Sequence, residues 1–109
     1  MNTSILSKAI DLFREYEEDI PVGTILCFLH LCENQYATVS EVEARFNLGK
    51  SRASRNMRNL TAHARPGKAG INVANTRPDS ADYRVTLFFL NDRGIALKER
   101  LKGVLNHLS

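Results

Sequence analysis

Basic side chains recur about once per helical turn between residues 50 and 65, and they are the residues of this chain best suited to bind a ligand. Arginine pairs with guanine edges and asparagine with adenine edges, while serine and alanine let a helix approach DNA closely. The candidate DNA-binding residues here are Lys50, Ser51, Arg52, Ser54, Arg55, Arg58 and Asn59, with Arg65 and Lys68 in the turn-rich basic loop 65–70.

The apolar residues of the same stretch predict a helix over about residues 51–64. Ala53, Met57 and Leu60 follow the spacing i, i+4, i+7 and form one inward stripe, which leaves the basic residues on the outer side. Before it, Ser40 and Glu43 form an S-x-x-E capping box that predicts the start of a shorter helix. Asn47-Leu48-Gly49 predicts its end, because Asn and Gly tolerate a left-handed backbone. The pattern predicts a helix-turn-helix, with a solvated helix that is merely basic as the alternative.

Charge is segregated along the chain, although its net value is only +3. Residues 1–44 carry a net charge of −6, residues 45–84 of +7 and residues 85–109 of +2. Basic charge confined to the predicted reading helix and the segment after it is typical of a surface that binds a polyanion. The acidic first third would keep the rest of the surface away from phosphates.

The remaining elements complete a recognisable order. Apolar periodicity predicts helices over 4–18 and 22–34, and Tyr36-Ala37-Thr38-Val39 is a short β-prone link. Runs 71–76 and 83–90 predict a β-hairpin with a polar tip. Asn91 is suited to cap a last helix, over 92–108. The order α-α-(β)-α-α-β-β-α predicts a mainly α fold with a small β-hairpin, a winged helix-turn-helix, in one domain over 1–109.

The two terminal segments, 1–19 and 92–109, carry apolar stripes wider than one-sided packing needs. Pairing them across a two-fold axis would bury both stripes, and the symmetric dimer is the commonest closed oligomer. The alternative is a monomer with apolar termini. The candidate dimerisation residues are Ile5, Leu6, Ala9, Ile10, Phe13, Leu101, Val104, Leu105 and Leu108.

No set of residues in the sequence predicts catalysis, a metal site or a cofactor. The Cys27 and Cys32 spacing suits neither zinc nor a C-x-x-C redox motif, so both are expected to be buried and reduced. His30 is expected to be a core or boundary residue rather than a ligand. The sequence has no leader and no apolar run long enough to span a membrane, which predicts a cytoplasmic protein that is not an enzyme.

Three short motifs, in order, resemble MarR-type transcriptional regulators: Thr38-Val39-Ser40 leading into the two helices, Asp82-Tyr83-Arg84 in the hairpin, and Leu90-Asn91-Asp92-Arg93-Gly94. The resemblance covers roughly residues 20–105. It implies that Asp82 orients Arg84 toward the DNA minor groove, with Arg77 able to serve as well. An acidic residue two positions from an arginine on a hairpin shares its face, which makes this pairing chemically reasonable.

Three departures from the family are visible. Asn56 stands where an apolar residue is usual, Asn91 replaces a Thr, and the 65–70 loop is enlarged. The chain is also short for the family, as a regulator encoded by a phage or another mobile element would be.

The sequence thus predicts a regulator that binds double-stranded DNA sequence-specifically, most simply a homodimeric repressor on a palindromic operator. Helix 51–64 would enter the major groove and wing 77–84 the minor groove. Arg55, Arg52 and Ser51 would reach base edges, while Arg58 and Lys50 would hold phosphates. Two alternatives stay open: a winged-helix module that binds proteins, as an adaptor or anti-host protein would, and a replication or partition protein that binds repeated sites. A small-molecule effector is neither predicted nor excluded.

Overall fold

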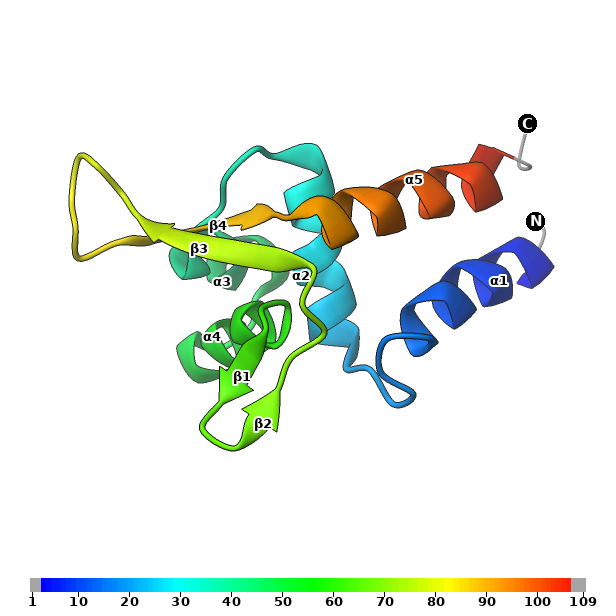
Figure 1. Ribbon diagram of the computed structural model, residues 1–109, viewed down its shortest axis with the longest axis horizontal. Helices are drawn as coiled ribbons and strands as arrows, with labels where there is room; N and C mark the ends of the chain where they lie inside the picture. The colour runs from blue at the N-terminus through cyan, green and yellow to red at the C-terminus, as the bar shows by residue number, and fades with distance from the viewer. Residues whose placement is uncertain (1–2, 107–109) are drawn as a thin grey trace.

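The computed structural model describes residues 3–106 and contains five helices and two small antiparallel sheets within that range. Figure 1 shows helices α1 and α5 projecting together at one end and the β3–β4 loop at the other end. The elements are α1 (Thr3–Arg14), α2 (Val22–Glu33), α3 (Val39–Phe46), α4 (Lys50–Asn59), β1 (His63–Arg65), β2 (Lys68–Ala69), β3 (Ala74–Pro78), β4 (Thr86–Leu90) and α5 (Asp92–Leu105). The order matches the prediction except for β1–β2, a hairpin where a loop was expected.

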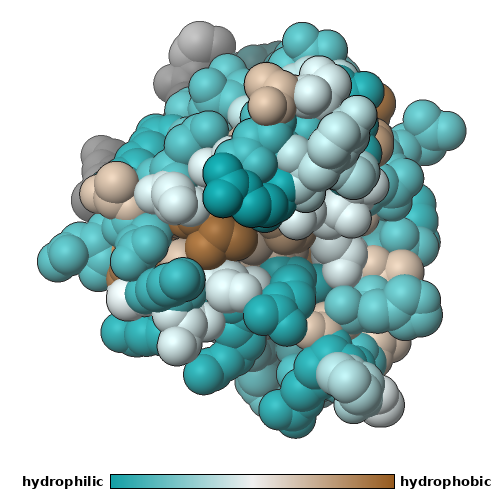
Figure 2. Space-filling view, turned by 90° about the vertical axis from the view of Figure 1, so that its left-hand side faces the viewer, coloured by the Kyte–Doolittle hydropathy of each residue, from teal (hydrophilic) through white to brown (hydrophobic). Residues whose placement is uncertain are grey.

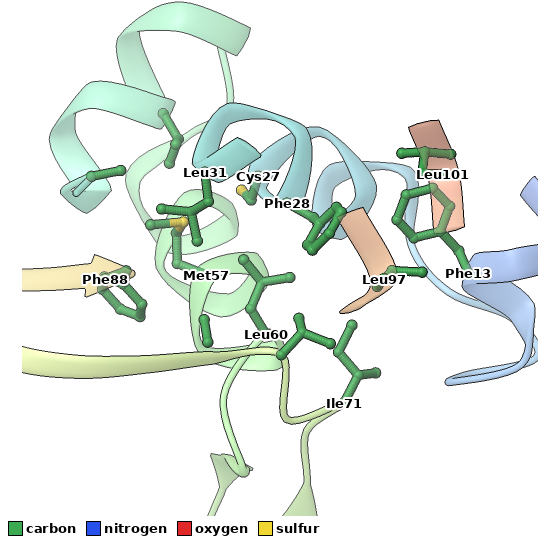
Figure 3. Packing of buried hydrophobic residues seen from close by; sticks show 14 of the residues in the cluster. Phe13, Cys27, Phe28, Leu31, Met57, Leu60, Ile71, Phe88, Leu97 and Leu101 are labelled. Atoms are coloured by element: carbon green, nitrogen blue, oxygen red, sulfur yellow. The ribbon is translucent and has the colours of Figure 1, made fainter. Parts of the chain in front are cut away.

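The hydrophobic core lies around α2, the helix whose apolar residues surround it on nearly all sides. Phe28 of α2 is fully buried, and its ring meets that of Phe13 edge to face at 5.5 Å. Met57 and Leu60 approach from α4 and its end, and Leu97 from α5, all three fully buried (Figure 3). Since the predicted inward stripe of α4 is its buried side, the basic residues of that helix face outward.

The helix-turn-helix forms as predicted, but the cap of its first helix was assigned to the wrong residue. α3 begins two residues earlier, because Thr38 is the N-cap and its hydroxyl accepts a hydrogen bond from the Glu41 amide at 3.2 Å. The S-x-x-E match at Ser40 is therefore not the capping box. Asn47 ends α3 in the left-handed conformation, with φ 52°, as predicted.

Helix α4 ends at Asn59, five residues before the predicted end, because the next segment of chain takes its final carbonyls. The amide of Ile71 donates to the Asn59 carbonyl at 2.9 Å, and that of Val73 donates to the Leu60 carbonyl at 2.8 Å. The Thr61 hydroxyl adds a bond of 2.7 Å to the Arg58 carbonyl. These bonds also explain why β3 begins at Ala74 and not at residue 71.

The wing is the β3–β4 hairpin, paired in register from Ala74 opposite Leu90 to Pro78 opposite Thr86. Ala37 forms an isolated antiparallel bridge with Phe88, so the predicted β-prone link pairs with β4 at a single residue. Strand β4 starts at Thr86 rather than at residue 83, because the chain is still turning there: the Val85 amide donates to the Asp82 carbonyl at 2.9 Å.

The start of α5 is held tightly against the segment before β3. Asn91 caps α5 as predicted, accepting from the Gly94 amide at 3.0 Å, and its amide group donates to the Asn72 side-chain oxygen at 3.2 Å. A Cβ on Gly94 would collide with the Val73 carbonyl oxygen. The Leu-x-x-x-Gly motif thus has a structural reason, since only glycine permits this close approach.

Helices α1 and α5 pack on each other within the chain, joined by Arg100 and Glu15 at 2.9 Å. This uses part of the predicted dimer surface. Leu6, Ile10 and Leu105 are 58 %, 41 % and 40 % exposed, and Val104 is half-buried. Four other dimerisation candidates are buried by packing within the chain, so they are removed from the predicted dimer surface: Ile5, Ala9, Phe13 and Leu101. Leu108 lies outside the described residues.

Candidate nucleic-acid interface

Helix α4 presents a row of exposed basic side chains on the side away from the core. Lys50, Arg52, Arg55 and Arg58 are all exposed, and Ser51 is exposed among them. Figure 2 shows the face formed by the wing, α3 and α4, where hydrophilic residues predominate. The predicted reading residues are therefore accessible on one helix face.

Arg58 is directed by a neighbour one turn earlier on the same helix. Its Nε and Nη2 donate to the Ser54 hydroxyl oxygen at 3.2 and 2.8 Å. This bond draws the guanidinium back along α4 and makes Ser54 a positioning residue for Arg58. Arg52 and Arg55, three residues apart, share one helix face and extend into solvent.

Asn59 was predicted to contact DNA, and the structure contradicts this. Its side chain is 7 % exposed, and its amide nitrogen donates to Glu17 Oε1 at 2.8 Å and to the Thr24 hydroxyl at 3.2 Å. Thr24 in turn donates to Asn56 Oδ1 at 3.0 Å. The α1–α2 connection covers the end of α4, and no signal in the sequence placed Glu17 there.

The same network explains the polar residue noted at position 56. A Cβ on Gly23 would collide with the Asn56 side-chain amide, so α2 and α4 approach closely at this point. Asn56 fits because its oxygen accepts the Thr24 hydrogen bond. Asn56 and Asn59 thus join α4 to α2 and to the α1–α2 connection. These bonds fix the orientation of α4, and with it the direction in which its exposed face points.

The wing holds the predicted pair of charged residues in contact. Arg84 Nε donates to Asp82 Oδ1 at 3.0 Å and Nη2 to Oδ2 at 3.2 Å, while the Arg84 amide donates to Oδ1 at 3.1 Å. The side-chain bond first, and then the backbone bond, hold the pKa of the Asp82 carboxyl below its ordinary value. The Arg84 side chain is 90 % exposed, so it is oriented while remaining free to meet a partner.

Arg77, the other wing candidate, has a neighbour that sequence reasoning missed. Its guanidinium lies 4.5 Å from the centre of the Tyr36 ring, and that ring meets Phe89 edge to face at 5.9 Å. A cation over an aromatic face is attracted by the ring quadrupole. Arg77 therefore packs against the link before α3, whereas Arg84 lies at the tip of the wing.

Arg65 and Lys68 lie on the unexpected β1–β2 hairpin, beside α4. They are paired opposite each other in the register, and both are exposed. Lys68 Nζ lies 4.0 Å from Glu17 Oε2. All the predicted basic candidates thus fall on three neighbouring elements: α4, the wing and this hairpin.

The structure gives little support to metal binding, a reactive thiol or a membrane span within the residues that it describes. No group of three His, Cys, Asp or Glu residues within 3–106 could hold a metal ion. Cys27 is buried as predicted, whereas Cys32 is only half-buried. Burial raises the pKa of the Cys27 thiol to about 11, and mainly burial does the same for Cys32. His30 is 8 % exposed, and its Nδ1 accepts from Arg45 at 2.7 Å, as expected of a core histidine. No helix in the described range is both long and apolar enough to cross a membrane.

No protein-family model matches the sequence, and no curated protein matches it. Solved structures do resemble the fold. For Tm0710, a transcriptional regulator from Thermotoga maritima, the TM-score is 0.74 at 15 % identity, covering 97 % of this chain and 68 % of that one. For YusO from Bacillus subtilis the TM-score is 0.71 at 15 % identity, with coverages of 97 % and 68 %.

A third similar structure is the Escherichia coli MarR C80S mutant complexed with operator DNA. Its TM-score is 0.63 at 18 % identity, covering 94 % of this chain and 69 % of that one. At these identities the likeness establishes the fold. The chain has the winged helix-turn-helix fold of MarR-type transcriptional regulators.

Proposed function

We propose that this protein is a transcriptional regulator that binds double-stranded DNA sequence-specifically, with α4 in the major groove and wing 77–84 in the adjacent minor groove. The observation that carries the proposal is the outer face of α4, where exposed Arg52, Arg55 and Arg58 stand beside a wing that presents Arg84. Arginine is the commonest reader of guanine in the major groove and suits the narrow, electronegative minor groove of A·T-rich DNA. A similar structure contains operator DNA.

Arg55, Arg52 and Ser51 would contact base edges, because they lie within the first six residues of α4 on its exposed side. Arg58 and Lys50 would contact phosphates. Arg58 is bonded to Ser54 and so lies along the helix rather than pointing away from it. Binding of operator DNA would place the protein in the cytoplasm of a bacterial or phage-infected cell.

The proposed active form is a homodimer, and the proposed effect on transcription is repression by occupying an inverted repeat. Leu6, Ile10 and Leu105 leave apolar surface exposed on α1 and α5, at the end of the molecule away from the wing (Figure 1). Pairing there would leave both copies of α4 free. Two recognition helices about one DNA turn apart, ~34 Å, would read half-sites centred about 10 bp apart.

Two truncations on α4 test the division of roles. Arg55→Ala should lower affinity for the bound site by about 1–3 kcal/mol and relax preference at one base pair, as a lost base contact does. Arg58→Ala should weaken binding to every duplex alike and flatten the salt dependence by about 0.9 in log–log slope. Circular dichroism should be unchanged, because both side chains are exposed. Wild-type binding by both variants would refute α4 as the reading element.

A further inference from the structure

The β1–β2 hairpin is an exposed element placed directly after the recognition helix. His63 pairs with Ala69 and Arg65 with Lys68, across a Pro66-Gly67 turn. Gly67 has φ +78°, as the second central residue of a type II turn requires, and Pro66 supplies the fixed φ of the first. The turn therefore forces the basic stretch into a defined hairpin.

This hairpin contributes almost nothing to the core. Of residues 62–69, only Ala64 is even half-buried. The hairpin is nevertheless fixed to the end of α4: the Gly70 amide closes its base by donating to the Ala62 carbonyl at 3.1 Å, and the next amide, that of Ile71, donates to the Asn59 carbonyl of α4 at 2.9 Å. A Cβ on Gly70 would collide with the Thr61 carbonyl oxygen, so glycine allows this close docking. The β1–β2 hairpin is thus fixed in position although it contributes almost nothing to the hydrophobic core.

A groove of about 470 Å³ separates the hairpin from α4. Five of the residues that line it are cationic and none is acidic: Lys50, Arg55 and Arg58 from α4, and Arg65 and Lys68 from the hairpin. Glu17 lies outside this lining; its carboxylate accepts the Asn59 hydrogen bond and lies 4.0 Å from Lys68 Nζ, at one end of the groove. The groove therefore favours an anionic occupant.

The shape of the cationic lining indicates an extended anion. Lys50 and Arg58 are eight residues apart on α4, which corresponds to about 12 Å along the helix axis. This length is much greater than one phosphate group, so the lining suits an extended polyanion such as a nucleic-acid strand. Ser54 and Arg58 also line a second hollow, between α4 and the wing strands, so α4 has the wing on one flank and the hairpin on the other.

We propose that the hairpin is a second DNA-binding arm, and that the groove between it and α4 holds the phosphodiester backbone of one strand at the edge of the major groove. This rests on the proposed function, in which α4 enters that groove. Arg65 and Lys68 approach the phosphates from one side, and Lys50 and Arg58 from the other. The arm adds affinity and fixes the register of α4 without reading bases.

The test compares Arg65→Ala/Lys68→Ala with a control of equal charge change, Lys98→Ala/Lys102→Ala, on α5. Fluorescence anisotropy is measured on a duplex selected by the wild-type protein and on a scrambled duplex, between 50 and 200 mM salt. Loss of two phosphate contacts should lower the log–log salt slope by about 1.8. Affinity should fall at least about tenfold on both duplexes, with base preference unchanged. Ethylation interference should weaken at the phosphates that the groove holds, because only the contacts from α4 remain there.

The hairpin variant should keep the wild-type circular dichroism, since both replaced side chains are exposed. If the wild type binds the selected duplex and the hairpin variant keeps its affinity, slope and interference pattern, like the control, the second arm is refuted while the proposed function stands. A changed base preference with an unchanged salt slope would also refute it, because the arm would then be reading bases. If the wild type binds no duplex at all, the proposed function itself fails.

Discussion

Replacing Asn59 by alanine should destabilise the protein without changing which DNA sequence it prefers. The side chain is buried and donates one hydrogen bond to the Glu17 carboxylate and one to the Thr24 hydroxyl. A hydrogen bond to a charged group contributes about 1.5–3 kcal/mol and one between neutral groups about 0.5–1.5 kcal/mol. Since Glu17 is partly exposed and would be rehydrated, the expected loss is about 2–3 kcal/mol.

Urea unfolding followed by circular dichroism measures this loss, at one fixed protomer concentration because a dimer's stability depends on concentration. The melting temperature should fall by ~10 °C or more. Arg55→Ala is the matched control: it lies on the same helix with an exposed side chain, and it should unfold like the wild type. An Asn59→Ala protein of wild-type stability, or one with altered base preference, would refute the assignment of Asn59 to the helix-joining network.

Three further predictions test separate parts of the molecule. In the wing, Arg84→Ala should lower affinity most for sites with A·T-rich flanks, and adding Asp82→Ala should lower it little further; fully additive losses would show that Asp82 does not orient Arg84. Gly94→Ala should cost more than about 1 kcal/mol through backbone displacement, whereas Gly103→Ala, with open space around it, should be neutral or stabilising in urea unfolding. Ile10→Glu should shift the protein from dimer to monomer in sedimentation at micromolar concentration; a wild-type protein that sediments only as a 12.3 kDa species would contradict the dimer itself.

Local periodicity was sufficient to predict that the helices form and which face of α4 points outward, although α1 ends at Arg14 rather than at residue 18, as α4 ends early at Asn59. Ala53, Met57 and Leu60 mark the buried side of that helix by their spacing alone, and each is fully buried. The D-x-R contact was also predicted, but its geometry differs from the strand pairing expected: the two residues lie in the turn before β4, where the Arg84 amide donates to Asp82 Oδ1 at 3.1 Å. Asp82 and Arg84 are in contact.

Features that depend on contacts distant in sequence could not be predicted in this way. Asn59 has a neighbour 42 residues earlier in the chain, Glu17, and no pattern in either segment indicates the contact. The early end of α4 has the same origin, since amides of residues 71–74 occupy its last carbonyls. The cap at Thr38 was a different kind of error. Thr38-x-x-Glu41 and Ser40-x-x-Glu43 both match the capping pattern, and the bridge between Ala37 and Phe88 fixes where the strand ends.

Selection of bound fragments from random double-stranded DNA tests the central claim most directly, that α4 reads a specific sequence in the major groove. The wild-type protein should enrich an inverted repeat with half-site centres about 10 bp apart, and the Arg55→Ala protein should lose preference at one position in each half-site. Enrichment of direct repeats would contradict the two-fold arrangement. Failure of the wild-type protein to enrich any sequence would contradict sequence-specific binding altogether.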